Sequence, residues 1–205
     1  TALQFAEQGW HVIAIARSED TLADLAREQP RIEPRPADLT SGDFEGLIPE
    51  RVDALVHAAG ISPSARTVED ATIEDWTQAF TLNVISGAEL IRRALPALRT
   101  SRGTVVLVNS GAGIVPTPRN TVYGATKHAL RALANGLRAD EEERGVRVTS
   151  VFPGPTDTPM FTGDVPRDQL IEAASVARAI ISAVTATDDV QLTEIQVRPR
   201  RELSW

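Results

Sequence analysis

The sequence predicts a single α/β domain in which helices cover both faces of a doubly wound parallel sheet. Apolar runs of strand length alternate along the 205 residues with amphipathic helical stretches, which is typical of strand–helix–strand units. Several of the apolar runs are hydrophobic on both faces, as expected of strands that are buried between two helix layers. The chain has the length of one domain, and no linker or internal repeat divides it.

Five apolar runs are predicted to be strands, and a sixth run is a weaker candidate. The five runs are 11–16, 52–59, 103–110, 146–152 and 192–198. The sixth, 31–38, contains two prolines, which cannot donate to a neighbouring strand and therefore favour an edge position.

Helices are predicted between these strands, at 21–28, 72–100, 121–144 and 175–186. Thr72 and Asp75 resemble a capping box at the start of the second helix. The acidic run 140–144 is interpreted as a solvated helix end. The chain opens inside a further helix that ends near Gly9. A strand and a glycine-rich turn would precede such a helix in a dinucleotide-binding unit, and neither is present in the sequence.

Composition excludes several classes of protein. The formal charge of −7 disfavours nucleic-acid binding, which needs a basic face. The absence of cysteine excludes disulfides, thiol catalysis and thiolate metal sites, and the three histidines have no metal-ligand spacing, so no metal is expected. No apolar run reaches the roughly 18 residues of a membrane span, and no signal peptide is visible. These features predict a cytoplasmic enzyme or binding protein.

Tyr123 and Lys127 are the only tyrosine and the only lysine of the chain. Side chains four positions apart share one face of a helix, so both point into the same space. An ammonium group favours the ionised form of a nearby phenol, whose pKa is ordinarily about 10, and so moves it toward the range of a general acid–base. Ser110 ends a predicted strand, where open α/β folds bind ligands. The alternative is that Lys127 is an ordinary surface residue.

These residues resemble the short-chain dehydrogenase/reductase family, and the resemblance covers essentially the whole chain. It implies a Rossmann-like fold and the use of NAD(H) or NADP(H). By this resemblance, Tyr123 exchanges a proton with a carbonyl or hydroxyl, Lys127 lowers the pKa of the phenol and binds the nicotinamide ribose, and Ser110 holds the substrate oxygen. Asn83 in the tripeptide LNV would support a water-mediated proton relay; the alternative is a polar helix residue that is satisfied locally.

The resemblance also implies which residues contact the cofactor. Asp38 matches the residue that contacts the adenine, although a turn role is an alternative for it. His57 and Ala58 depart from the Asn-Asn-Ala-Gly of the family, and His57 is expected to be a buried, satisfied imidazole. Besides Tyr123 and Lys127, the implied contacts are Asp38, Leu39, Ala59, Gly60, Pro153, Gly154, Thr156 and Thr158.

The first predicted strand ends without an acidic residue and is followed by Arg17 and Ser18. An NAD site generally places Asp or Glu near this point to accept from the ribose 2′-hydroxyl, whereas a nearby Arg accommodates a 2′-phosphate. We therefore predict NADP(H), with NAD(H) less favoured, and place Arg17 and Ser18 at the 2′-phosphate. Glu19 and Asp20 are expected to begin the next helix, where acids suit the positive end of the helix dipole.

The family resemblance divides the domain into a cofactor half at about 1–110 and a catalytic and substrate half at about 111–205. It implies that a strand and a TG-x-x-x-G-x-G turn, roughly fifteen to twenty residues in all, precede the first residue of this sequence. Because that strand would be central, we expect the sheet to be interrupted without it.

The leading hypothesis is an NADP(H)-dependent oxidoreductase that acts on a ketone, aldehyde or secondary alcohol. A non-catalytic dinucleotide-binding regulator or scaffold is the alternative, and a sugar-nucleotide epimerase is disfavoured because only about fifty residues follow Pro153. Met160 and Phe161 suggest an apolar pocket wall, and the end LTEIQVRPR resembles the subgroup that acts on serine and 3-hydroxy acids. By resemblance, the long helices at 73–100 and 121–143 would form a homodimer or homotetramer.

Overall fold

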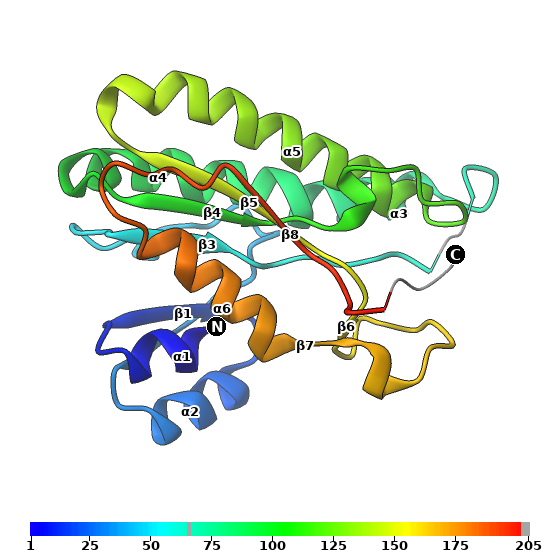
Figure 1. The fold of residues 1–205 in the computed structure, drawn as a ribbon, viewed down its shortest axis with the longest axis horizontal. Helices are drawn as coiled ribbons and strands as arrows, with labels where there is room; N and C mark the ends of the chain where they lie inside the picture. Colours follow the sequence, from blue (N-terminus) through cyan, green and yellow to red (C-terminus); the bar gives the residue numbers. More distant parts are fainter. Residues whose placement is uncertain (65–66, 202–205) are drawn as a thin grey trace.

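The computed structural model describes residues 1–64 and 67–201 and has the predicted α/β architecture. The helices are α1 Ala2–Glu7, α2 Glu19–Glu28, α3 Ile73–Phe80, α4 Ser86–Ser101, α5 Thr121–Glu141 and α6 Ala173–Val184. The strands are β1 Val12–Ala16, β2 Ile32–Pro36, β3 Ala54–His57, β4 Thr104–Val108, β5 Arg147–Pro153, β6 Thr156–Asp157, β7 Ile171–Glu172 and β8 Glu194–Val197. In Figure 1, α3, α4 and α5 lie on one face of the sheet, and α1, α2 and α6 lie on the other.

The main sheet consists of two groups of parallel strands. One group has the order β3-β4-β5-β8, and the other pairs β1 with β2. In the described part of the chain β1 and β3 are not paired with each other, and the apolar side chains at 12–15 are only partly buried. The expected interruption of the sheet therefore lies between β1 and β3.

The prolines of β2 occupy the edge position that the sequence predicts. Pro34 and Pro36 lie opposite Ala14 and Ala16 of β1, and within the described residues β2 has no second neighbour. A proline without an N–H is tolerated here because the outer side of an edge strand needs no donor. All six predicted strands are present, and their ends differ from the predicted ones by at most two residues.

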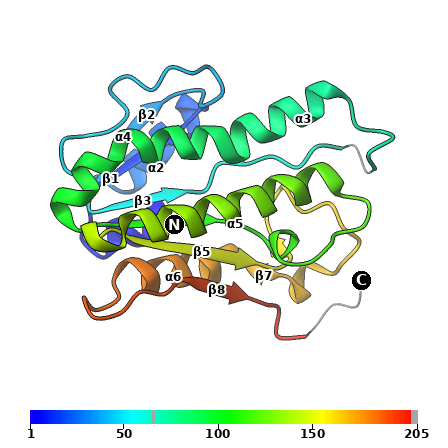
Figure 2. The same ribbon diagram turned by 90° about the horizontal axis from the view of Figure 1, so that it is seen from above.

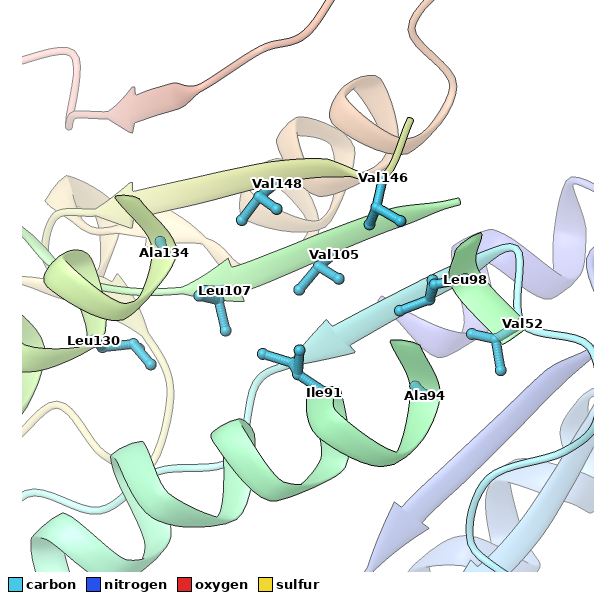
Figure 3. Packing of buried hydrophobic residues seen from close by; sticks show 10 residues of the cluster. All are labelled: Val52, Ile91, Ala94, Leu98, Val105, Leu107, Leu130, Ala134, Val146 and Val148. Carbon is cyan, nitrogen blue, oxygen red and sulfur yellow. The ribbon is translucent and has the colours of Figure 1, made fainter. Parts of the chain in front are cut away.

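A hydrophobic core fills the space between the sheet and the helices α4 and α5. Alternate residues of a strand point to opposite faces, so Val105 and Leu107 face these helices while Val106 faces α6. Figure 2 shows α4 and α5 side by side along this face. The side chains of the core cluster converge in Figure 3 and are Val52, Ile91, Ala94, Leu98, Val105, Leu107, Leu130, Ala134, Val146 and Val148.

The predicted helix signals at Thr72 and Gly9 are confirmed. The Thr72 hydroxyl accepts the N–H of Asp75 at 3.2 Å, and the Asp75 carboxylate accepts the N–H of Thr72 at 2.9 Å. These two bonds form a complete capping box at the start of α3. Gly9 follows α1 with a φ of +93°, a backbone conformation that residues with a Cβ rarely adopt.

The long helix predicted at 72–100 is interrupted, and the prediction of a continuous helix there is wrong. A π-helical turn at Thr81–Ile85 lies between α3 and α4, and it contains Asn83. In this turn the N–H of Ser86 bonds to the carbonyl of Thr81, five residues earlier. Such wide turns are rare and occur frequently at functional sites.

The acidic run at 140–144 is not entirely solvated, which corrects the sequence-based interpretation. Glu141 is only 2 % exposed, and its two carboxylate oxygens accept from Nε and Nη2 of Arg99 at 2.8 and 2.6 Å. Because a buried carboxylate needs a paired cation, this bidentate bond explains why Glu141 is tolerated at the junction of α4 and α5.

Candidate active site

Polar side chains and glycines follow the carboxyl ends of the parallel strands. Arg17 directly follows β1, Gly60 comes shortly after β3, Ser110 after β4, and Gly154 directly after β5. Parallel strands present their carboxyl ends at the same edge of a sheet, and open α/β sheets bind ligands outside this edge. The residues that the sequence selects from distant positions therefore lie along one edge.

Tyr123 and Lys127 lie in the first two turns of α5 and face the same space, as predicted. The ammonium nitrogen Nζ of Lys127 is 5.5 Å from the centroid of the Tyr123 ring. It also donates to the carbonyl oxygen of Val108 at 2.9 Å, and only 4 % of Lys127 is exposed. Lys127 is therefore a buried cation beside the phenol, and its interpretation as an ordinary surface residue is wrong.

The Ser110 hydroxyl belongs to the same group of side chains. Ser110 precedes the short 3₁₀ turn Gly111–Gly113, and its Oγ accepts the N–H of Ala112 at 3.2 Å. The same hydroxyl lies close enough to the Tyr123 phenol to lower its pKa. Ser110 therefore stabilises the turn that follows β4 and lies beside the phenol.

The pKa of the Tyr123 phenol is raised in the structure, whereas the sequence predicts that Lys127 lowers it. Burial raises the pKa of Tyr123, and the Ser110 hydroxyl opposes this rise. Burial also lowers the pKa of Lys127 to about 8, because the charged ammonium group is removed from water. The phenol is therefore protonated at neutral pH, where an unperturbed phenol with a pKa of about 10 would be protonated as well.

Asn83 is held rigidly between two parts of the chain. Its Oδ1 accepts the N–H of Ile61 at 2.7 Å, and its Nδ2 donates to the carbonyl of Ile61 at 2.9 Å and to Oγ1 of Thr126 at 3.0 Å. The side chain is fully buried. The amide therefore connects the π turn to the loop after β3 and to α5, directly beside Lys127.

His57 is a buried imidazole with a fixed partner. Its Nε2 lies 3.2 Å from the backbone oxygen of Asn83, and since a carbonyl only accepts, Nε2 carries the hydrogen. A Cβ at position 87 would lie 2.7 Å from the ring, so α4 approaches the imidazole through Gly87. Burial lowers the pKa of His57 to about 4; the bond to Asn83 opposes this, and the charge of Lys127 adds to it.

Two glycines keep the backbone close to these side chains. A Cβ at position 60 would lie 3.2 Å from Oδ1 of Asn83 and 3.8 Å from Nζ of Lys127. A Cβ at position 113 would lie 2.5 Å from Oδ1 of Asn109 and 2.8 Å from the backbone oxygen of Lys127. Gly60 leaves open the space over Asn83 and Lys127, which fits the close approach of a dinucleotide to the backbone.

The segment 153–158 is fixed against β8 at the same edge. The N–H of Gly154 donates to the backbone oxygen of Val197 at 2.8 Å, and Pro153 lies opposite Val197 in the β5–β8 register. The hydroxyl of Thr156 donates to the carbonyl of Gly154 at 2.9 Å, and that of Thr158 to the carbonyl of Thr156 at 3.4 Å. This segment therefore lies on the side of Ser110 that is away from β3.

Arg17, Ser18 and Asp38 gather at the ends of β1 and β2. Oγ of Ser18 accepts the N–H of Thr21 at 3.3 Å and so caps α2. Oδ1 of Asp38 accepts both the N–H and the hydroxyl of Thr40, at 2.9 and 2.7 Å. These bonds lower the pKa of Asp38, and the charge of Arg17 lowers it further, so the guanidinium lies near this carboxylate.

The first turn of α2 and the buried Leu39 also belong to this corner. Glu19 and Asp20 occupy the first turn of α2, as predicted. Leu39 is 7 % exposed and belongs to an apolar cluster against which Ala59 packs. In this corner, the apolar side chains of Leu39 and Ala59 therefore lie near the exposed guanidinium of Arg17 and the amino end of α2.

The sequence did not single out Asn109 and Thr126, which support the site. Oδ1 of Asn109 accepts the N–H of Ser110 at 2.9 Å, and Thr126 both accepts from Asn83 and donates to the backbone oxygen of Tyr123. Each is the residue directly before a predicted catalytic residue, Ser110 or Lys127, and each is buried. A polar residue at a buried position next to a catalytic side chain is the signal that could have found them.

The sequence predicts neither a membrane span nor a metal site, and residues 1–64 and 67–201 can be inspected for both. No helix there is both long enough and apolar enough to cross a membrane. Within the same residues, no three or more His, Asp or Glu side chains are grouped as a metal site would require.

The model of the short chain dehydrogenase family matches residues 1–169. The chain is a member of the short-chain dehydrogenase family. An uncharacterized oxidoreductase of Staphylococcus epidermidis is 30% identical to it over 212 residues, covering 97% of this chain and 90% of the relative.

Solved structures of the family have the same fold. Serine dehydrogenase from Escherichia coli superposes with a TM-score of 0.81 at 25% identity, covering 96% of this chain and 89% of that one. The closed form of a serine dehydrogenase complexed with NADP+ gives a TM-score of 0.83 at 23% identity, covering 96% and 88%. This short-chain dehydrogenase is therefore an oxidoreductase with a Rossmann-like fold.

Proposed function

We propose that the protein interconverts a carbonyl and a secondary alcohol by hydride transfer with NADP(H), and that Tyr123 is the general acid and base. The observation that carries this proposal is the joint placement of Tyr123, Lys127, Ser110 and Asn83 at the carboxyl edge of the sheet. A protein that only binds a dinucleotide does not need a buried phenol beside a desolvated ammonium group.

The proposed chemistry assigns one task to each side chain. When bound, the reduced cofactor supplies a hydride to the carbonyl carbon. Ser110 donates a hydrogen bond to the carbonyl oxygen, and the protonated Tyr123 phenol delivers the proton that completes the hydroxyl. In the reverse direction, the phenolate of Tyr123 would accept the proton of the alcohol while the carbon-bound hydrogen leaves as a hydride to a bound oxidised cofactor, whose positive charge would favour the phenolate.

Lys127 and Asn83 support this exchange of protons. A lysine whose pKa is about 8 both holds and releases a proton near neutral pH, and its Nζ lies under the phenol ring. Asn83 lies beside it, fixed by Ile61 and Thr126, in the position where the family resemblance expects a water-mediated relay. We assign Lys127 a second contact, to the nicotinamide ribose.

NADP(H) is the proposed cofactor, with NAD(H) less favoured. Arg17 lies at the end of β1, where an NAD site would generally carry an acid, and its guanidinium suits a 2′-phosphate. Ser18 and the amino end of α2 add a hydroxyl and a favourable dipole. The serine dehydrogenase of similar fold was solved with NADP+, which supports this choice.

The remaining proposed cofactor contacts follow the same edge from β2 to β5. Asp38 and Leu39 would face the adenine, Ala59 and Gly60 would approach through their backbone, and 153–158 would follow the nicotinamide. The residues proposed for this last contact are Pro153, Gly154, Thr156 and Thr158.

Substitution of Tyr123 by Phe separates an enzyme from a dinucleotide-binding regulator. The variant keeps the ring and loses only the hydroxyl, so NADPH binding, measured by fluorescence titration, should change by less than about threefold. Turnover of a panel of ketones, aldehydes and secondary alcohols should fall by about a hundredfold or more. Wild-type protein that binds NADPH and turns over no member of the panel would favour the regulator, and an active Tyr123→Phe variant would refute the assigned role.

A homodimer or homotetramer is proposed as the assembled form. Ile73 in α3 and Ile85 in the π turn are 71% and 56% exposed, and packing of this helical segment against a second copy would bury both side chains. Analytical ultracentrifugation measures the assembly directly. A cytoplasmic location stays a prediction.

A further inference from the structure

The residues that directly follow β8 are fixed against the catalytic edge. Val197 lies opposite Pro153, and its carbonyl accepts the N–H of Gly154 at 2.8 Å. Pro199 is buried, and a Cβ at position 154 would lie 3.1 Å from its Cδ. Arg198 stands between these two anchored residues, which fix the position of its backbone.

The guanidinium of Arg198 lies over the turn that begins with Ser110. A Cβ at position 111 would be 3.7 Å from Nη1 of Arg198 and 4.0 Å from the backbone oxygen of Pro153. Because residue 111 is a glycine, nothing separates the guanidinium from the backbone next to Ser110. Arg198 is exposed, and it takes part in no side-chain hydrogen bond or ion pair within residues 1–64 and 67–201.

We propose that Arg198 binds the carboxylate of the substrate, and that the substrates are therefore short hydroxy acids and the corresponding oxo acids. This inference rests on the proposed function, since it needs the substrate hydroxyl or carbonyl to be held by Ser110 and Tyr123. The planar fork of an arginine donates two parallel hydrogen bonds to a carboxylate, which fixes both its position and its orientation. A hydroxy acid carries its two polar ends only a few bonds apart, in keeping with an arginine beside the residue that follows Ser110.

The position of Arg198 argues against a contact with the phosphates at the adenosine end of the cofactor. The proposed 2′-phosphate site is at Arg17, which follows β1, whereas Arg198 follows β8 at the opposite end of the sheet order. Ser110 and Gly154 lie between these two ends. An anion at Arg198 therefore lies on the substrate side of the nicotinamide segment.

The local charge agrees with an anionic substrate in a chain that is acidic as a whole. The formal net charge is −7, yet three of the four residues 198–201 are arginines, namely Arg198, Arg200 and Arg201. Arg200 and Arg201 line a cavity of about 340 Å³ together with Asp168, Gln169 and Leu170. Asp168 offsets one of the two positive charges, and the net positive charge that is left raises the local concentration of small anions.

Paired substrates test this inference without depending on a single compound. We would measure the oxidation of short 3-hydroxy acids with NADP+, each beside its methyl ester, which lacks the charge. In the wild type the KM of the acid should be the lower of the two. Substitution of Arg198 by Gln should raise the KM of the acid about tenfold or more and leave its kcat and the KM of the ester nearly unchanged.

Two variants accompany Arg198→Gln as controls. Arg198→Lys keeps the charge and loses the fork, so the KM of the acid should lie between those of the wild type and the Gln variant. Arg178→Gln removes the same charge from the exposed side of α6, where Arg178 donates to Ser175, and should leave every constant unchanged.

The outcomes separate this inference from the proposed function. Turnover of neutral alcohols with no preference for the acids, or an unchanged KM in Arg198→Gln, would overturn the role of Arg198 and leave the oxidoreductase standing. A weaker NADPH affinity in Arg198→Gln at an unchanged ratio of acid to ester would also overturn it, since the residue would then serve the cofactor. No turnover of acid, ester or neutral alcohol would overturn the proposed function itself, and this inference with it.

Discussion

The side chains around Tyr123 are buried and held by distant partners, whereas the residues proposed to bind the adenosine end of the cofactor are exposed and held locally. Lys127, Asn83 and His57 are 4 %, 0 % and 2 % exposed, and their partners lie far away along the chain. Arg17 and Asp38 are exposed, and the hydrogen bonds of Asp38 go to Thr40, two positions away. The proposed proton transfer would therefore depend on packing that many residues fix together. The proposed cofactor selectivity would depend on surface groups that can be exchanged with little effect on the fold.

The largest effect is expected when the buried cation is removed. Lys127→Met keeps an apolar stem of similar length and loses the ammonium group, so turnover should fall about 10²- to 10⁴-fold in steady-state kinetics. His128→Gln changes the next residue of α5, which is exposed, and should retain wild-type turnover. A Lys127→Met variant as active as the wild type would remove the distinction between the two regions.

His57 should make the stability of the buried region depend on pH. The pKa of His57 is about 4 in the folded protein and about 6.5 in the unfolded chain. Between pH 6.5 and 4 the imidazole is therefore protonated in the unfolded chain and neutral in the folded protein. The free energy of unfolding should accordingly fall by about 3 kcal/mol between pH 6.5 and 4 on account of this residue. In urea denaturation, the free energy of unfolding of His57→Gln should fall less between pH 6.5 and 4 than that of the wild type. The same fall in both proteins would show that the pKa of His57 is not lowered by folding.

Two glycines of the catalytic half give a matched pair of tests. In Gly113→Ala the new Cβ meets Oδ1 of Asn109 at 2.5 Å and the backbone oxygen of Lys127 at 2.8 Å, so the free energy of unfolding should fall by about 1–3 kcal/mol. Gly136 of α5 has nothing within 4 Å of a new Cβ, and Gly136→Ala should raise it by about 0.5–1 kcal/mol. Equal changes in thermal or urea denaturation would contradict the tight packing around Ser110 and Lys127.

The smallest effect is expected at the exposed corner. Arg17→Glu should shift the ratio of kcat/KM for NADPH and NADH by about tenfold or more toward NADH, because a carboxylate repels the 2′-phosphate and accepts from a 2′-hydroxyl. The melting temperature should be unchanged. Arg27→Glu, at the far end of α2 and also exposed, should leave the ratio as it is. An unaltered ratio in Arg17→Glu would place the cofactor selectivity elsewhere.

The parts of the molecule that depend on local sequence could be predicted. The strand–helix alternation, the capping box at Thr72 and the spacing of Tyr123 and Lys127 each follow from residues a few positions apart, and the structure agrees with them. The position of Ser110 follows as well, since the end of a buried strand decides its edge of the sheet.

Features that depend on distant partners could not be predicted. The π turn contains Asn83, whose amide bonds to Ile61 and Thr126, 22 and 43 positions away. Glu141 appears in an acidic run that looks solvated, and it is buried because Arg99 reaches it from α4. Burial is also what raises the pKa of Tyr123, and the pair of lone residues alone suggested the opposite direction.

Tyr123 is the chain's one tyrosine, so the ultraviolet absorbance of tyrosinate reports its ionisation alone. Titrated without dinucleotide, the phenol should show a pKa above its ordinary value of about 10 because of burial. Saturating NADP+ should lower this pKa, since it adds a positive charge beside the phenol, and NADPH, with a neutral nicotinamide, should lower it less. A phenol that titrates at or below pH 10 on its own, or that does not respond to NADP+, would contradict the assignment of Tyr123 as the buried proton donor of a hydride-transfer site.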